Sequence, residues 1–278
     1  MEINQYEYEE YDNYWTHNDM FIFKPHFNDC ISTDLINIKY TKLIFSNYDK
    51  FKYSIASYYE NYNDNIEPNN FNKSVDNLNQ HLLQIIFADE FNNPVDNLPQ
   101  SLKFLTLGHK FNKSIDNLPQ SLVFLSFNIN ENYNFKSEFN KLVNNLPQSL
   151  KYLKINNNFN QLVDNLPNNL IHLNLGYKFN QFVDNLPSSL THLKLSSNFN
   201  RTIDNLPNYL THLTLSGIFN KPIDNLPNYL THLILDVDYY RPIENLPNSL
   251  ILLVVDSKRQ LQYIKNLPTK CKVDIINY

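Results

Sequence analysis

The sequence predicts a repeat solenoid, with short parallel β-strands on a concave face, extended or 3-10 return limbs and little α-helix. The first supporting observation is the period, because Phe-Asn and Asn-Leu-Pro recur mostly every 20 residues. The second is Leu-x-x-Leu-x-Leu, which follows Asn-Leu-Pro with small variations and alternates at its end, as a half-buried strand does. Since 20 residues are too few for a strand, two turns and a full return helix, the return limb is expected to be extended.

Six apolar columns are expected to form a continuous core, because one unit cannot bury its own apolar face and stacked units can. In the unit at 159–178 these columns are Phe159, Val163, Leu166, Leu170, Leu173 and Leu175. Equivalent strands would pair in parallel at about 4.8 Å. The array is predicted to be one right-handed, curved domain of about ten or eleven coils, roughly 50 Å long.

Two asparagine columns, in Phe-Asn and in Asn-Leu-Pro, are expected to be buried and to bond the backbone of their own coil and of the next. An aspartate column before Asn-Leu-Pro is expected to have a similar structural role; it includes Asp116, Asp164, Asp184, Asp204 and Asp224. A ladder of calcium ions is the alternative. It would need several oxygen ligands for each ion, and one Asp per coil supplies too few.

The ends of the array are less regular than its middle. We expect four segments: an N-terminal cap or acidic-aromatic docking segment (1–26), degenerate repeats (27–70), regular repeats (71–255) and a C-terminal cap (256–278). Alternation in 271–277 predicts a last edge strand. Between Phe127 and Phe139 lie eight residues more than in other units, and this insertion at 128–138 is either a recognition loop or a tolerated extension.

Composition argues against several classes of function. A net charge of −5 gives no basic excess for nucleic acid, and no run of about 18 apolar residues predicts a membrane span. The only cysteines, Cys30 and Cys271, are too few for a disulfide framework, so a reducing, cytoplasmic location is expected. Gly-rich phosphate loops, Gly-x-Ser-x-Gly, His-Glu-x-x-His and Cys-x-x-Cys are all absent from the sequence. We therefore expect no enzyme, no catalytic residue, no cofactor and no metal ion.

A histidine returns every 20 residues between two leucines, at His172, His192, His212 and His232. The flanking leucines face the core, so these side chains should face outward from the concave sheet. Toward the N-terminus the row continues as Tyr152, Phe124 and Phe104. The neighbouring outward row reads Thr106, Ser126, Lys154, Asn174, Lys194, Thr214 and Ile234. We predict that the aromatic, imidazole and lysine side chains of this face bind a protein partner.

Two other interpretations of the histidines stay open. They could be copied spacers that merely stack, duplicated with the repeat. A metal-binding or enzymatic site is the remote alternative, although no cysteine or carboxylate in the row completes a coordination sphere.

The segments "FNNPV" (91–95), "NLPNYLTHLTL" (205–215) and "FNKPI" (219–223) resemble the FNIP repeat, a relative of the leucine-rich repeat. The resemblance is strong over 71–255 and implies a leucine-rich-repeat-like solenoid that serves as a protein-interaction scaffold. It also implies an origin in amoebae or their large DNA viruses, and host cytoplasm as the location if the protein is viral. Some relatives carry an F-box that recruits a ubiquitin ligase, so a substrate-recognition adaptor is the alternative function, although 1–40 lacks such a box. The partner's identity and the oligomeric state stay open.

Overall fold

The computed structural model describes residues 9–31, 39–46, 70–87, 89–127, 137–155, 158–237 and 239–276. Most of the expected degenerate repeats and of the insertion at 128–138 lie outside the described residues. The chain forms two compact units, Met1–Lys141 and Leu142–Tyr278, which we call unit 1 and unit 2. Among the described residues, no helix has the length and apolar character needed to cross a bilayer.

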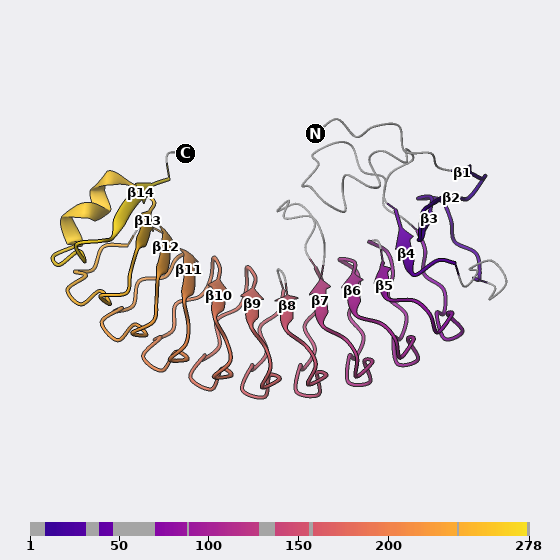
Figure 1. Ribbon diagram of the computed structural model, residues 1–278, viewed down its shortest axis with the longest axis horizontal. Helices are drawn as coiled ribbons and strands as arrows, with labels where there is room; N and C mark the ends of the chain where they lie inside the picture. Colours follow the sequence, from indigo (N-terminus) through magenta and orange to yellow (C-terminus); the bar gives the residue numbers. More distant parts are fainter. Residues whose placement is uncertain are drawn as a thin grey trace. The chain divides into compact units, whose positions relative to one another are not determined.

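Unit 1 begins with an antiparallel ribbon and continues as a parallel sheet (Figure 1). Its strands are β1 (Glu9–Glu10), β2 (Tyr14–His17), β3 (Met20–Phe23), β4 (Lys42–Phe45), β5 (Gln84–Ile86), β6 (Phe104–Leu107) and β7 (Phe124–Phe127). The pairs β1–β2 and β2–β3 are antiparallel. Each later pair, from β3–β4 to β6–β7, is parallel, with equivalent residues of successive coils side by side.

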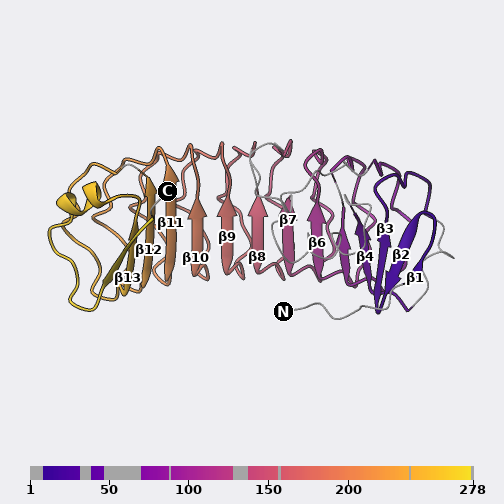
Figure 2. The same cartoon turned by 90° about the horizontal axis from the view of Figure 1, so that it is seen from above.

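Unit 2 is a parallel sheet throughout its described residues, and Figure 2 shows β8 to β11 lying side by side. The strands are β8 (Tyr152–Ile155), β9 (His172–Leu175), β10 (His192–Leu195), β11 (His212–Gly217), β12 (His232–Val237), β13 (Leu252–Val255) and β14 (Lys272–Ile275). A short 3-10 helix, η1 (Lys258–Tyr263), lies between β13 and β14. The strand β14 forms where the C-terminal alternation predicts it and pairs in parallel with β13.

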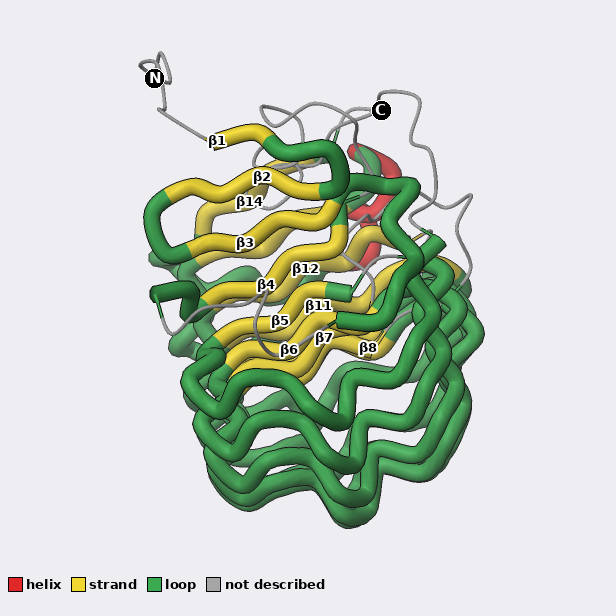
Figure 3. The backbone as a smooth tube through the Cα atoms, turned by 90° about the vertical axis from the view of Figure 1, so that its right-hand side faces the viewer, coloured by secondary structure: helices red, strands yellow, loops and turns green. Residues whose placement is uncertain are grey.

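Each coil has its strand on one side and extended loop segments on the other (Figure 3). The described residues contain a single helix, of the 3-10 type, so the prediction of little α-helix is confirmed. Extended return limbs follow from the short repeat, since Pro suits a limb whose N–H groups do not join a ladder.

The apolar columns form the core as predicted. All six columns of the 159–178 unit are buried, with Leu170 and Leu175 showing no exposed surface. Phenylalanine rings of successive coils stack in nearly parallel planes, with centroids 6.1 Å apart between Phe159 and Phe179 and 6.2 Å between Phe179 and Phe199. Each buried Leu or Phe side chain contributes about 1.5–3 kcal/mol, which makes this stacked core the main source of stability.

The asparagines of Phe-Asn connect neighbouring coils. The main-chain N–H of Asn200 donates to Oδ1 of Asn180 at 3.0 Å, and that of Asn220 donates to Oδ1 of Asn200 at 3.0 Å. The prediction that these asparagines are buried is wrong, because Asn180 and Asn200 are half-buried and Asn160 is exposed. They lie at the edge of the coil, where one side-chain oxygen can reach the backbone of the next turn.

The aspartate column has the expected structural role. The Nδ2 group of Asn205 donates to Oδ1 of Asp184 at 3.3 Å, and Nδ2 of Asn225 donates to Oδ1 of Asp204 at 3.2 Å. Each carboxylate thus accepts from the coil that follows it. These bonds help to keep the strands of successive coils in register.

Candidate protein-binding face

The outward side of the unit 2 sheet carries one histidine per strand from β9 to β12. In β10 the two leucines, Leu193 and Leu195, are 2% and 0% exposed. Successive side chains of a strand point to opposite faces, so His192 and Lys194 point away from the core. The in-register pairing aligns the histidines in what we call the imidazole row: His172, His192, His212 and His232.

The rings of the imidazole row stack on one another. Their centroids are 4.0 Å apart between His172 and His192, 4.1 Å between His192 and His212, and 4.2 Å between His212 and His232. The ring of Tyr152 extends the stack, with its centroid 4.6 Å from that of His172. Stacking covers the ring faces, so a partner would meet the ring edges that carry the nitrogen atoms.

A threonine precedes three of these histidines and bonds to the ring. Oγ1 of Thr211 lies 2.9 Å from Nδ1 of His212 and donates to the carbonyl oxygen of Thr191 at 3.1 Å. Oγ1 of Thr231 makes the same two contacts, 2.9 Å to Nδ1 of His232 and 3.0 Å to the carbonyl oxygen of Thr211. Thr191 repeats the arrangement with His192.

These contacts favour one tautomer of the neutral rings. Each threonine hydroxyl has one hydrogen, which can go to Nδ1 or to the carbonyl oxygen, and that oxygen also accepts two backbone N–H groups. Both threonine contacts are hydrogen bonds only when the hydroxyl donates to the carbonyl and Nδ1–H of His192, His212 or His232 donates to Oγ1. In that tautomer Nε2 holds the lone pair, and no described residue hydrogen-bonds to these Nε2 atoms. His172 follows Ile171, which has no hydroxyl, and is not restricted in this way.

The row favours neutral imidazoles. Partial burial is the largest cause that lowers the pKa of His172, His192 and His212 from its ordinary value. Other imidazoles of the row lower the pKa further, because like charges on adjacent rings repel.

The ring geometry does not suit a metal ion. The lone pair of Nε2 lies in the ring plane, so an ion shared by two rings must lie in both planes. The rings of His192 and His212 are within 10° of parallel, with centroids 4.1 Å apart, and two such planes have no common point near the nitrogens. Among the described residues, no three His, Cys, Asp or Glu side chains are grouped closely enough to hold a metal ion.

The neighbouring outward row gives this face its charge. Lys154 on β8 is half-buried and Lys194 on β10 is exposed, while Asn174 and Thr214 between and beyond them are neutral. Outward side chains from β8 to β11 include no carboxylate. This part of the face is therefore neutral to positive, although the whole chain has a net charge of −5.

In unit 1 the predicted face is only partly accessible. Phe104 is 44% exposed and Phe124 is half-buried, and their ring centroids are 6.3 Å apart. Thr106 and Ser126, which were expected to be available on the second row, are buried at 8% and 5% exposure. They continue a row of buried apolar side chains, which belong to a cluster of Trp15, Met20, Ile22, Ile44 and Ile86. Thr106 lies beside Ile86 of this cluster in the sheet, and Ser126 lies beside Thr106.

The profile of the FNIP repeat matches residues 91–129, 139–178, 182–218 and 219–254, which is more than half of the chain. The chain belongs to the FNIP repeat family. No protein of curated function matches its sequence.

Solved structures similar to this FNIP repeat chain include CroV588 and an internalin. CroV588, described as a novel circular leucine-rich-repeat protein, is 31% identical with a TM-score of 0.69, and the match covers 95% of this chain and 41% of that chain. This chain therefore spans less than half the length of CroV588. An internalin, InlF, from Listeria monocytogenes is 14% identical with a TM-score of 0.43, and the match covers 94% of this chain and 87% of the internalin.

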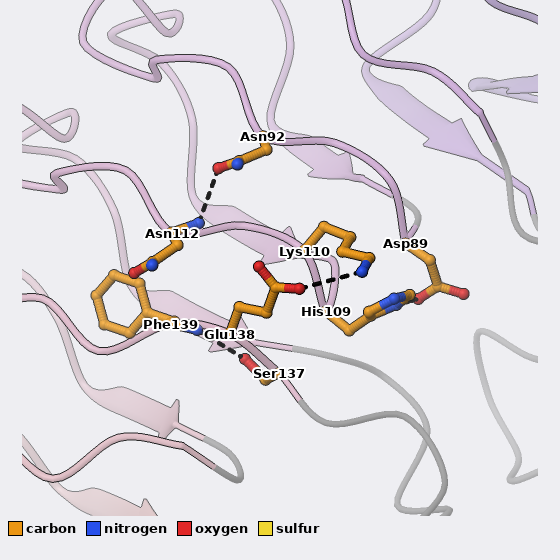
Figure 4. Close-up of polar contacts among 8 residues, drawn as sticks. All are labelled: Asp89, Asn92, His109, Lys110, Asn112, Ser137, Glu138 and Phe139. Carbon is orange, nitrogen blue, oxygen red and sulfur yellow. Dashed lines mark hydrogen bonds and ion pairs between the residues drawn. The ribbon is translucent and has the colours of Figure 1, made fainter.

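The structure adds features that the repeat pattern alone did not reveal. The threonines that bond the histidines, Thr191, Thr211 and Thr231, are always the residue before the histidine, and this spacing was the available signal. A further group lies after β5 and β6 of unit 1 (Figure 4). There Nδ1 of buried His109 lies 2.8 Å from Oδ1 of buried Asp89, close enough for an ion pair but without hydrogen-bond alignment.

The Asp89–His109 pair occupies equivalent positions in successive FNIP repeats. Next to it, Nζ of Lys110 lies 3.1 Å from Oε1 of Glu138, in a pair whose side chains are both exposed (Figure 4). The main-chain N–H of Glu138 donates to the carbonyl oxygen of His109. These contacts connect successive coils, so the pair has a structural role.

Proposed function

We propose that this FNIP repeat protein is a non-catalytic interaction scaffold whose protein partner binds the outward sheet face of unit 2. The observation that carries this proposal is the imidazole row, extended by Tyr152 and flanked by Lys194. Tyr152 is 39% exposed and begins the ring stack, and Lys194 is exposed on the neighbouring outward row.

The other chemical groups of the repeat already have structural partners. The apolar columns form the core, the Phe-Asn asparagines bond the next coil, and the aspartates accept from the next Asn. The outward face is a further set of side chains that repeats without serving the core. Its positions are fixed by the in-register parallel sheet, so little conformational entropy is lost when a partner binds.

We place this activity inside a cell. Both cysteines, Cys30 and Cys271, are free, and Cys30 is exposed. An exposed thiol is compatible with a reducing compartment.

Affinity capture tests the proposal. The purified chain is immobilised, and partners from the natural host cell are identified by mass spectrometry. A face variant, Tyr152→Ala with Lys194→Glu, is compared with a control variant, Tyr209→Ser with Tyr229→Ser. Those two tyrosines are 61% and 59% exposed and precede β11 and β12 in the chain, outside the outward row.

The proposal expects a partner that wild type and the control variant both retain and that the face variant loses. Equal retention by all three proteins would contradict the assignment of this face. If the retained partner is a ubiquitin-ligase scaffold, the adaptor function is favoured over a general scaffold.

A further inference from the structure

His192, His212 and His232 differ from ordinary surface histidines because Nδ1 of each ring is already engaged. Each Nδ1 lies 2.8–2.9 Å from a threonine hydroxyl that also reaches a backbone carbonyl of the preceding coil. A free neutral imidazole can exchange tautomers and present either nitrogen as a donor. In these three residues a neutral ring whose Nδ1–H donates to the threonine presents only a lone pair at Nε2.

This restriction determines which groups can bind at the ring edges. A carboxylate oxygen only accepts hydrogen bonds, so it cannot bond to an Nε2 atom that also only accepts. It can bind there once a proton from solvent has been added to Nε2, which makes Nε2–H a charged donor. A charge-assisted bond of this kind is roughly twice as strong as a neutral one.

The charged side chains near the imidazole row indicate the sign of the charge that a partner should carry. On the neighbouring strands of unit 2, the outward groups are Tyr152 and Lys154 on β8, Asn174 on β9, Lys194 on β10 and Thr214 on β11. Beyond the row, Leu252 of β13 lies beside His232, and Lys272 and Asp274 of β14 form an ion pair with each other at 2.9 Å. From β8 to β11 the charged outward side chains are Lys154 and Lys194, and each protonated imidazole adds to this positive charge.

We propose that the rings of His192, His212 and His232 are Nδ1–H tautomers and that their face docks an acidic peptide segment, with one solvent proton added at Nε2 for each carboxylate that binds there. This inference rests on the proposed function, since it names the chemistry of the partner that the face takes. The threonines are positioning residues, because they act through the rings and not on the partner directly.

The stack limits how many protons the row accepts. Adjacent rings are 4.0 to 4.2 Å apart, so two neighbouring imidazolium charges repel strongly. Alternate rings can be charged together at lower cost. We therefore expect one or two protons, and not four, to be taken up with an acidic segment.

A peptide is favoured over nucleic acid as the source of the negative charge. Nucleic acid presents a dense array of phosphates, and proteins bind it with a large basic surface. This chain has a net charge of −5 and only two lysines on the second row between β8 and β11. A peptide carries a few scattered carboxylates, and this number matches the one or two rings of the row that can be protonated together.

Isothermal titration calorimetry with the full chain tests the proposal. The probe is octaglutamate with blocked termini, and the matched controls are octaglutamine and an oligothymidylate. Titrations at about pH 7.5 and about pH 5.5, which bracket the ordinary histidine pKa of about 6.5, are each run in two buffers of different ionisation enthalpy to count protons. Wild type should bind octaglutamate with uptake of about one or two protons, so its affinity should rise roughly tenfold or more for each unit of falling pH.

Two variants separate the roles of ring and threonine. His192→Phe with His212→Phe keeps a ring in the stack but cannot titrate, and it should lose the pH dependence and most of the affinity. Thr191→Val with Thr211→Val releases the Nδ1 proton, so neutral rings can present Nε2–H. That variant should bind better than wild type at about pH 7.5 and show a flatter dependence on pH.

Several results would overturn the inference. They are binding without proton uptake, equal binding of octaglutamine or oligothymidylate, and no binding of octaglutamate at about millimolar concentration at either pH. If the capture experiment shows a partner lost by Tyr152→Ala with Lys194→Glu while proton uptake is absent, the proposed function stands and the acidic-segment inference fails.

Discussion

Replacing Leu213 with aspartate should unfold or fray unit 2, whereas replacing its neighbour Thr214 with alanine should change little. Leu213 is 1% exposed and lies between Leu193 and Leu233 of the adjacent strands. Thr214 is half-buried, points to the opposite face, and has no hydrogen bond from its side chain among the described contacts. The two substituted residues are adjacent in sequence, so comparing them isolates the effect of the direction in which each side chain points.

The expected magnitudes follow from burial. Removing the leucine side chain alone costs about 2–5 kcal/mol, because surrounding coils cannot collapse fully into the space. The carboxylate adds the penalty of placing an ionisable group in an apolar core, which is at least about 1–3 kcal/mol. The total is comparable with the whole stability of a typical domain, about 5–15 kcal/mol. Thr214→Ala should stay within about 0.5 kcal/mol of wild type.

Urea unfolding, followed by circular dichroism, measures the two variants against wild type. Leu213→Asp should lose the cooperative transition or move it to much lower urea, while Thr214→Ala should overlay on wild type. Equal shifts for the two variants would refute the inward and outward assignment on which the binding face depends.

Three further predictions test other parts of the structure. Asn200→Ala should lower the free energy of unfolding by about 1 kcal/mol, because the N–H of Asn220 loses its acceptor, while exposed Asn208→Ala should change it by less than about 0.5 kcal/mol in urea titrations. Asp89→Ala should lower the free energy of unfolding by about 1–3 kcal/mol, because it breaks the buried pair with His109. Glu138→Gln, in the exposed pair with Lys110, should lower it by less than about 1 kcal/mol. Similar losses for the two variants in thermal unfolding would contradict this contrast. The lowered pKa of His172, His192 and His212 means that the unfolded chain binds protons more readily, so stability should be fully present above about pH 6.5 and should fall as pH decreases toward the folded-state pKa. Replacing these three with Phe should flatten the melting temperature between about pH 7.5 and pH 5.5, and an unchanged slope would argue against the row as its source.

Much of the fold could be predicted from the sequence because each column of the repeat has one physical role. The positions of Leu173 and Leu175 in an alternating segment determined which side chains are buried, and the copied unit then determined the register. The positions of the four histidines on one outward row followed from the same alternation. Their role in binding stays a prediction.

Other features depend on distances that a repeat pattern does not contain. The contact between Thr211 and His212 favours a tautomer only because the hydroxyl also reaches the carbonyl of Thr191, in the preceding coil. Thr106 is buried beside Ile86, which belongs to an apolar cluster that begins with strands outside the regular repeats. The error about buried asparagines had a similar origin, because a polar side chain can bridge two coils at their surface without entering the core.

The most direct test of the account is the protonation state of the individual ring nitrogens. Nitrogen-15 NMR of side-chain-labelled histidine, with assignment by single His→Phe variants, distinguishes protonated Nδ1 from protonated Nε2 at about pH 7.5. We expect the Nδ1–H tautomer for His192, His212 and His232, and its loss at His192 and His212 in Thr191→Val with Thr211→Val. The Nε2–H tautomer at these positions in wild type would contradict it, because the ring edges would then already present donors without taking up a proton.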